Sequence, residues 1–290
     1  MTLDKRLNAY RADLADARLR GTVAAPRYVE GRNARVVAGR APVRPRPDPQ
    51  AQVSTFYHYG EALLVFDEAG LHAWCQSLFD GYVGYVEARH IAVGPAPEAT
   101  HFVATSGAWA YKAPDLRSAA NDFLPRHSAV VVAETGLVTR GTEYAQLDTG
   151  SYLPLACLSP EPPRSPDIVA AAALYLGCPY LWGGRSWLGI DCSGLVQNAF
   201  RDLALTVPRD TDMQQGAIGE RVPVDRQADL RRSDLLYLPG HVLIYGGDGA
   251  VIHADGVSMM VRRDDLARLM RERGLAFSGF VVRRHAAAGV

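Results

Sequence analysis

The chain has 290 residues and a balanced charge, with 31 basic and 31 acidic side chains and a formal net charge of zero at pH 7. Proteins that bind nucleic acid normally carry an excess of basic residues, so this balance disfavours a nucleic-acid partner. No apolar run approaches the roughly 18 residues that a membrane helix needs, and we therefore expect no membrane partner.

Residues 1–34 are rich in charged side chains and are predicted to form an arm, with a short amphipathic helix around Leu7–Leu19. This segment lacks the apolar core of a secretory signal peptide. The four cysteines of the chain lie far apart, without a CxxC pair, which is typical of reduced thiols in a chain of this size. Both observations predict a cytoplasmic protein.

Residues 51–158 consist of short apolar runs bounded by glycine and aspartate, which predict β-strands. The proline-rich stretch at 41–50 excludes helix. A weak repeat relates ALLVFDEAG…DGYVGYV to AVVVAETG…DTGSYLPL, about 67 residues further on. We interpret it as two small β-barrels, over residues 35–95 and 96–160, followed by a proline-rich linker.

The pattern changes to an α+β domain over residues 163–287. Ser165 is the predicted N-cap of a first helix, with Pro166 at its first position. A glycine-rich loop follows, and apolar residues at helical spacing then predict a second helix from Cys192. Four strand-like runs come after it, so helices are expected to pack on an antiparallel sheet.

Cys192 lies at the start of the second predicted helix and has three interpretations. It is a buried packing residue, a metal ligand or a nucleophile. The unpaired amides and the positive dipole of a helix start favour a thiolate there. The same amides are suited to bind an oxyanion, and Asp191 and Ser193 flank the thiol. A packing role is the interpretation kept for the other cysteines: Cys75, Cys157 and Cys178.

A base for Cys192 is predicted from a hairpin further along the chain. The runs HVLIYGG and AVIHADG are joined by the turn signal GGDG at 246–249. Folding about that turn brings His241 opposite position 253 or 254. His241 is then the base, and His253 fixes its tautomer and ring orientation. The alternative for His253 is a core histidine satisfied by backbone groups.

These residues carry a family resemblance. CPYLWGG, DCSGLVQNAF, VPRDTDMQQ and RRSDLLYLPGHVLIYGGDGAVIHA occur in the order typical of NlpC-type papain-like cysteine peptidases of bacterial cell-wall metabolism. The resemblance implies a papain-like fold over residues 163–287, with Cys192 as nucleophile, His241 as base and His253 as the orienting group. It also implies that Tyr180 contributes to the site.

Residues 1–158 resemble the two bacterial SH3-like domains of dipeptidyl-peptidase-type members of this family. Those enzymes cleave the γ-D-glutamyl–diamino acid bond of murein peptides with a free N-terminal L-Ala. The resemblance implies acidic and tyrosine groups that recognise the ammonium. The candidates are Glu61, Tyr82 and Asp191, with Tyr85 as an alternative to Tyr82.

The predicted function is therefore a cysteine peptidase that acts on a murein-derived peptide in peptidoglycan recycling, and we expect no cofactor and no metal. Ser193 and Asp210 are also predicted to contact the substrate, although Asp210, Arg209 and Gln214 more readily hold local structure. Two alternatives remain: a binding module with an inactive peptidase domain, and an amidase or acyltransferase on the same fold. The oligomeric state is not predicted.

Overall fold

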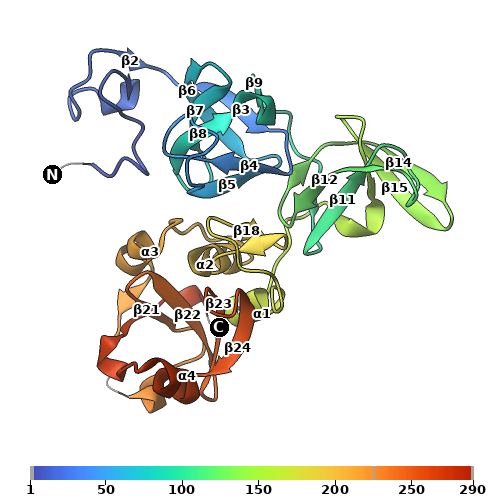
Figure 1. The fold of residues 1–290 in the computed structure, drawn as a ribbon. Helices are drawn as coiled ribbons and strands as arrows, with labels where there is room; N and C mark the ends of the chain where they lie inside the picture. Colours follow the sequence, from blue (N-terminus) through green and yellow to red (C-terminus); the bar gives the residue numbers. More distant parts are fainter. Residues whose placement is uncertain (1–2, 225, 289–290) are drawn as a thin grey trace. The chain divides into compact units, whose positions relative to one another are not determined.

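The computed structural model describes residues 3–224 and 226–288. The chain divides into two compact units, the first ending at Pro163 and the second beginning at Arg164 (Figure 1). This division falls within the predicted proline-rich linker.

The N-terminal arm packs on the sheet that follows it. Its apolar residues Ala9 and Leu14 form a cluster with Phe66 and Trp74. Residues 7–19 hold only turns, the short strand β1 (Ala15–Asp16) and a 3-10 turn at Ala17–Leu19, so the predicted amphipathic helix is wrong. The arm's polar groups bond the sheet instead, since the carbonyl oxygen of Leu7 accepts from Gln76 Nε2 at 2.8 Å.

The first β-body of this unit contains a sheet in the order β8-β7-β6-β3-β9 and a separate β4-β5 pair. Its core is apolar and includes Val36, Val65 and Val86. Strand β3 begins at Arg32, three residues before the predicted domain boundary. The remaining strand bounds are β2 (Tyr28–Val29), β3 (Arg32–Val36), β4 (Arg40–Val43), β5 (Thr55–His58), β6 (Ala62–Ala69), β7 (His72–Ser77), β8 (Val83–Glu87) and β9 (Ile91–Val93).

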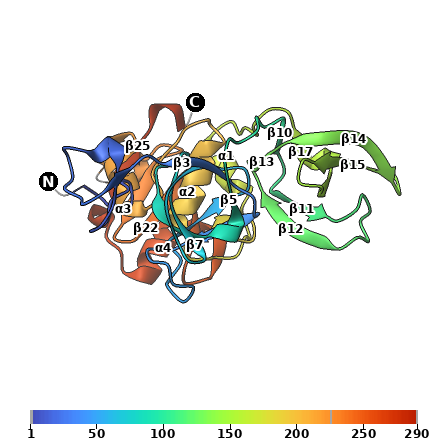
Figure 2. The ribbon, with the colours of Figure 1, turned by 90° about the horizontal axis from the view of Figure 1, so that it is seen from above.

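A second β-body follows, with its own core around Val103, Leu124 and Leu153. It combines a sheet in the order β12-β11-β16-β15-β14 with another in the order β13-β10-β17 (Figure 2). Its identity as a second SH3-like domain stays a prediction. The strands are β10 (His101–Val103), β11 (Gly107–Tyr111), β12 (Ala120–Pro125), β13 (Ala129–Val130), β14 (Val132–Thr139), β15 (Thr142–Leu147), β16 (Tyr152–Pro154) and β17 (Leu158–Ser159).

The second unit combines helices with a sheet in the order β20-β25-β21-β22-β23-β24, as the predicted α+β class requires. Side chains of β22 alternate between two cores. Val242 and Ile244 pack with helices α1 (Ile168–Ala173) and α2 (Cys192–Arg201), whereas Leu243 and Tyr245 pack with α4 (Leu266–Arg273). The strands are β18 (Arg185–Ser186), β19 (Gly189–Ile190), β20 (Glu220–Arg221), β21 (Leu235–Leu238), β22 (His241–Gly247), β23 (Ala250–Asp255), β24 (Met260–Asp265) and β25 (Val281–Arg284).

Four helices of this unit have the bounds α1 (Ile168–Ala173), α2 (Cys192–Arg201), α3 (Thr211–Ala217) and α4 (Leu266–Arg273), among the residues that the structure describes. Helix α1 begins later than predicted. Its N-cap is Asp167, whose side chain accepts from the amide of Ala170 at 2.6 Å, and Ser165 instead bonds Asp202. A carboxylate can cap a helix as well as a serine, so the sequence did not distinguish the two.

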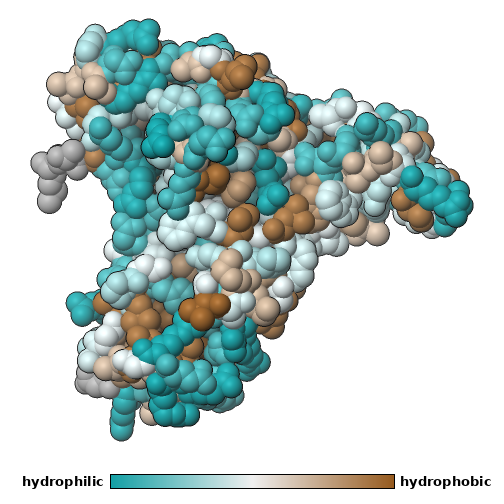
Figure 3. Space-filling model, in the orientation of Figure 1, coloured by the Kyte–Doolittle hydropathy of each residue, from teal (hydrophilic) through white to brown (hydrophobic). Residues whose placement is uncertain are grey.

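The surface of the described residues is mostly polar on the face shown in Figure 3, with scattered apolar side chains. No helix within residues 3–224 and 226–288 is both long and apolar enough to cross a membrane.

Helix α2 lies close to the loop that precedes it, and this contact requires glycine. A Cβ added to Gly194 would overlap the carbonyl oxygen of Gly184. We expect Gly194→Ala to lower the free energy of unfolding by about 1–3 kcal/mol because the loop must move. Thermal or urea unfolding of the purified chain measures this.

Gly216→Ala is the matched control, because Gly216 also lies in a helix and a Cβ there has no neighbour within 4 Å. It should raise stability by about 0.5–1 kcal/mol, as alanine normally does in a helix. Equal effects of the two substitutions would contradict the packing argument.

Candidate active site

Helix α2 begins at Cys192 because Asp191 caps it. The Asp191 Oδ1 accepts from the amide of Gly194 at 2.7 Å, and the Asp191 carbonyl accepts from Leu195 at 2.9 Å. The amides of Cys192 and Ser193 donate to no acceptor within the described part of the chain. Those two groups at the positive end of the helix are therefore suited to bind an oxyanion.

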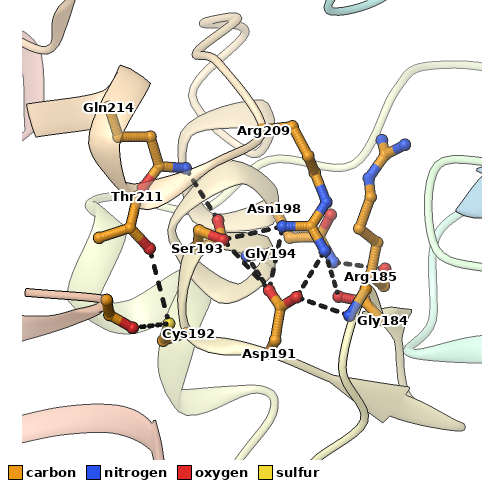
Figure 4. A network of polar contacts seen from close by, with 12 residues as sticks. Gly184, Arg185, Asp191, Cys192, Ser193, Gly194, Asn198, Arg209, Thr211 and Gln214 are labelled. Carbon is orange, nitrogen blue, oxygen red and sulfur yellow. Dashed lines mark hydrogen bonds and ion pairs between the residues drawn. The ribbon is translucent and has the colours of Figure 1, made fainter. Parts of the chain in front are cut away.

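A buried ion pair holds the cap in place (Figure 4). Arg209 donates to both Asp191 oxygens, at 3.0 and 2.7 Å, and to Ser193 Oγ at 2.8 Å. The amide of Gly183 in the glycine-rich loop donates to Asp191 Oδ2 at 2.8 Å. Gln214 Nε2 donates to the Ser193 carbonyl at 2.9 Å. The network joins the loop, the helix start and α3 around one carboxylate.

The Cys192 thiol lies between α3 and the start of β22. Its Sγ is 3.8 Å from Thr211 Oγ1 and 3.9 Å from the carbonyl oxygen of Gly240, and the residue is 6% exposed. Burial, then the charge of Asp191, raises the pKa of the thiol to about 11. Burial thus opposes the thiolate that the helix dipole favours, and the resting protonation state of Cys192 stays a prediction.

The hairpin forms, but its register differs from the predicted one. The turn is the two-residue Asp248–Gly249, with φ of 51° and 77°, as in a type I′ turn. Beyond it Ile244 pairs with Ile252. Continued in that register, position 241 faces position 255 rather than 253 or 254. The shift arises because the turn lies later in the chain than the centre of GGDG and because the register of β22 shifts once more between Tyr245 and Gly247.

His241 and His253 still meet, as diagonal neighbours on one face of the sheet. The Nε2 of His241 is 2.9 Å from Nδ1 of His253. Burial, then the charge that His253 carries when protonated, lowers the pKa of His241 to about 4, so its imidazole is neutral at pH 7.

Asp264 extends this pair and was missed by the sequence analysis. Its Oδ2 lies 3.0 Å from His253 Nε2, and its Oδ1 accepts from Arg262 at 2.7 Å and from Arg268 at 3.0 Å. Burial opposes ionisation, but the bond from His253 and the charge of Arg262 lower the pKa of the Asp264 carboxyl below its usual value. The sequence signal that could have revealed Asp264 was the segment Met260–Asp265, which forms strand β24 and which we did not predict to be a strand.

Thr211 was also missed, although it lies within the quoted block VPRDTDMQQ. It is the first residue of α3, and its hydroxyl is the side-chain group that the thiol of Cys192 contacts. No hydrogen bond joins Cys192 to the His241 ring among the described residues. The sulfur instead contacts the carbonyl of Gly240, directly before the histidine, so the nucleophile and base candidates lie at one end of β22.

The other candidates of this unit lie around the same helix start. Tyr180 is half-buried, and burial, then the charges of Cys192 and Asp191, raises the pKa of its phenol to about 12. The Ser193 hydroxyl accepts a hydrogen bond from Arg209 and donates one to Asp191 Oδ1. Asp210 precedes α3 without capping it through its side chain. Substrate contact by each of these side chains stays a prediction.

The residues of the first unit that were predicted to bind the ammonium group are buried in that unit or hydrogen-bonded within it. Glu61 is 5% exposed, and its Oε2 accepts from the amide of His58 at 3.2 Å. Tyr82 packs in the core of the first β-body. The Tyr85 hydroxyl accepts from Arg11 of the arm at 3.1 Å.

Alkylation tests the protonation state of Cys192. Iodoacetamide reacts with thiolate, so a pKa of about 11 predicts a rate constant that rises about tenfold per pH unit from pH 7 to pH 10. Peptide mass spectrometry of the alkylated free enzyme measures it. Cys178 is the internal control, since burial raises the pKa of its thiol to about 12. A plateau below pH 7 would instead indicate a preformed thiolate.

Comparison with known proteins assigns the two regions. Residues 177–275 match the NlpC/P60 family, and residues 43–91 match the bacterial dipeptidyl-peptidase Sh3 domain. A dipeptidyl-peptidase 6 of Lysinibacillus sphaericus is 28% identical over 240 residues, covering 77% of this chain and 87% of that protein. A γ-D-glutamyl-L-lysine dipeptidyl-peptidase of Bacillus subtilis (strain 168) is 34% identical over 117 residues, covering 38% of this chain and 38% of that protein.

A solved structure shares the fold. The crystal structure of an NlpC/P60 family protein from Bacillus cereus ATCC 10987 superimposes with a TM-score of 0.69 at 18% identity, covering 87% of this chain and 99% of that one. The predicted resemblance is confirmed at the level of domains, with one SH3 domain matched. The chain therefore carries a domain of the NlpC/P60 cysteine peptidase family together with a bacterial dipeptidyl-peptidase SH3 domain.

Proposed function

We propose that this cysteine peptidase hydrolyses the γ-D-glutamyl–diamino acid bond of murein peptides that begin with a free L-Ala. The observation that carries the proposal is the His241–His253 hydrogen bond at the strand end that contacts Cys192. The names of the relatives, dipeptidyl-peptidase 6 and γ-D-glutamyl-L-lysine dipeptidyl-peptidase, support the substrate class.

The proposed reaction starts from a neutral thiol and a neutral imidazole. Sγ of Cys192 attacks the γ-carbonyl carbon while His241 takes the thiol proton. The developing oxyanion accepts hydrogen bonds from the free amides at the start of α2. The C–N bond then breaks, and His241 returns the proton to the leaving amine.

Water completes the cycle by hydrolysing the γ-glutamyl thioester. His241 takes a proton from the attacking water, the C–S bond breaks, and the thiol of Cys192 recovers the proton. The histidine must be unprotonated at both attack steps. The low pKa of His241 satisfies this requirement at neutral pH.

Recognition of the free amine is assigned to Glu61 as the main anionic partner. A buried carboxylate forms a strong, charge-assisted hydrogen bond with an ammonium. Tyr82 and Tyr85 are the weaker candidates, because the first packs in a core and the second bonds Arg11. Asp191 is the other acidic candidate, although its oxygens already accept from Arg209, Gly183 and Gly194 in the structure.

The cellular role is proposed to be recycling of murein peptides in the cytoplasm. All four thiols are free in the structure, which suits a reducing compartment. Fractionation of the native host, followed by detection of the chain in the soluble cytoplasmic and the exported fractions, tests the location separately from the activity.

The first experiment uses L-Ala-γ-D-Glu-L-Lys and its N-acetylated form as substrates. Wild type should release L-Ala-γ-D-Glu from the free-amine peptide, and Cys192→Ala should lose at least about 10⁴-fold in kcat because the nucleophile is gone. Product formation is followed by liquid chromatography and mass spectrometry. Full activity in Cys192→Ala would overturn the mechanism, and binding without cleavage by wild type would favour a binding module.

The second experiment tests Glu61. Glu61→Gln removes the charge and keeps the shape, so kcat/KM for the free-amine peptide should fall roughly 10- to 100-fold. The N-acetylated peptide should be cleaved equally slowly by both forms. Glu68→Gln is the matched control, because Glu68 lies half exposed on the same β-body and pairs with Arg32. Equal losses in the two variants would contradict the assignment.

A further inference from the structure

We propose that Asp264 is a positioning residue that acts through His253 to keep the Nδ1 of His241 unprotonated and ready to take the thiol proton. The inference rests on the proposed function, since it assumes that His241 is the base. It extends the predicted Cys-His-His set by one buried carboxylate.

The first step concerns the bond between Asp264 and His253. An ionised carboxylate only accepts hydrogen bonds, so the 3.0 Å contact places a proton on His253 Nε2. Asp264 is 4% exposed and His253 is fully buried. Arg262 and Arg268 both donate to the other oxygen of Asp264, and their charges keep the carboxylate ionised.

In the second step, the proton position on His253 determines the tautomer of His241. A neutral His253 with its proton on Nε2 has a bare Nδ1, which is an acceptor. The 2.9 Å contact to this atom therefore needs a donor, and the donor is Nε2–H of His241. A neutral His241 then has its lone pair on Nδ1. The carboxylate sets the tautomer of a ring that it does not touch.

The third step concerns the charge that appears during catalysis. When His241 takes the thiol proton at Nδ1 it becomes an imidazolium that still donates through Nε2 to His253. The negative charge of Asp264 lies at the far end of this chain of hydrogen bonds and favours the cation. No proton has to reach the carboxylate, which only orients and stabilises.

A second carboxylate near the histidines does not have this role. Asp255 ends β23 and its charge favours the protonated forms of His241 and His253, but its Oδ1 accepts from Arg273 of α4 at 2.7 Å. Its oxygens also accept from the amides of the following turn. Of these two carboxylates, Asp264 is the one that forms a hydrogen bond with a ring nitrogen, that of His253 Nε2, among the described residues.

The test combines kinetics with a spectroscopic signature. In wild type labelled with ¹⁵N-histidine, we expect NMR at pH 7 to show both His241 and His253 as Nε2–H tautomers. In Asp264→Ala, the His253 signal should change toward the Nδ1–H tautomer or a mixture. Asp264→Asn should lower kcat roughly 10- to 100-fold, with KM changed less than about twofold.

Asp234→Asn is the matched control. Asp234 is fully buried and pairs with an arginine, Arg284, in the same sheet. The substitution should cost stability without changing the histidine tautomers or the split between kcat and KM. An unchanged kcat in Asp264→Asn would overturn the inference.

The spectrum separates this inference from the proposed function. The wild-type tautomers are read without substrate, so they remain measurable if the chosen peptide is not cleaved, and they do not depend on whether a variant folds. A wild-type spectrum with Nδ1–H on His241 would overturn the role of Asp264 even if Cys192→Ala is inactive. Full activity of Cys192→Ala would overturn the proposed function and leave the tautomer assignment standing.

Discussion

The candidate site depends on one buried carboxylate, that of Asp191. A charge removed from water is strongly unfavourable unless every lone pair finds a donor. Asp191 meets this condition with Gly183, Gly194 and Arg209, which belong to three different segments. Satisfying the carboxylate therefore brings the glycine-rich loop, the helix start and the segment before α3 together. The position of Cys192, the next residue, follows from that constraint.

Burial also determines how the site is protonated at rest. The rise of the Cys192 pKa from 9 to about 11 corresponds to about 3 kcal/mol against the thiolate. A helix dipole contributes about 0.3–1 kcal/mol in its favour, which is too little to reverse this. Desolvation lowers the pKa of His241 in the same way. Burial therefore favours a neutral thiol and a neutral imidazole, and in the proposed mechanism charge separates only when the thiol attacks.

The two histidines show how much of a side-chain contact can be predicted from local sequence patterns. Turn chemistry and strand alternation were enough to predict that His241 and His253 lie on adjacent strands. The register was wrong, because it depends on where the turn lies, and GGDG allows more than one position. The two histidines are still in contact because position 253 lies two residues from position 255, so its side chain is on the same face of the sheet. The predicted helix at Leu7–Leu19 does not form, because the arm contacts Phe66, Trp74 and Gln76 of the neighbouring sheet instead.

The sequence by itself determined the α+β class of residues 163–287, the helix that starts at Cys192 and the histidines that accompany it. These features depend on contacts close along the chain, such as a cap, a turn or an apolar period. Only the tertiary structure decided that Arg209 neutralises Asp191, that Thr211 contacts the thiol and that Asp264 completes the histidine pair. Those partners lie on separate elements, and the free energy of burying a charge selects them only after the chain has folded.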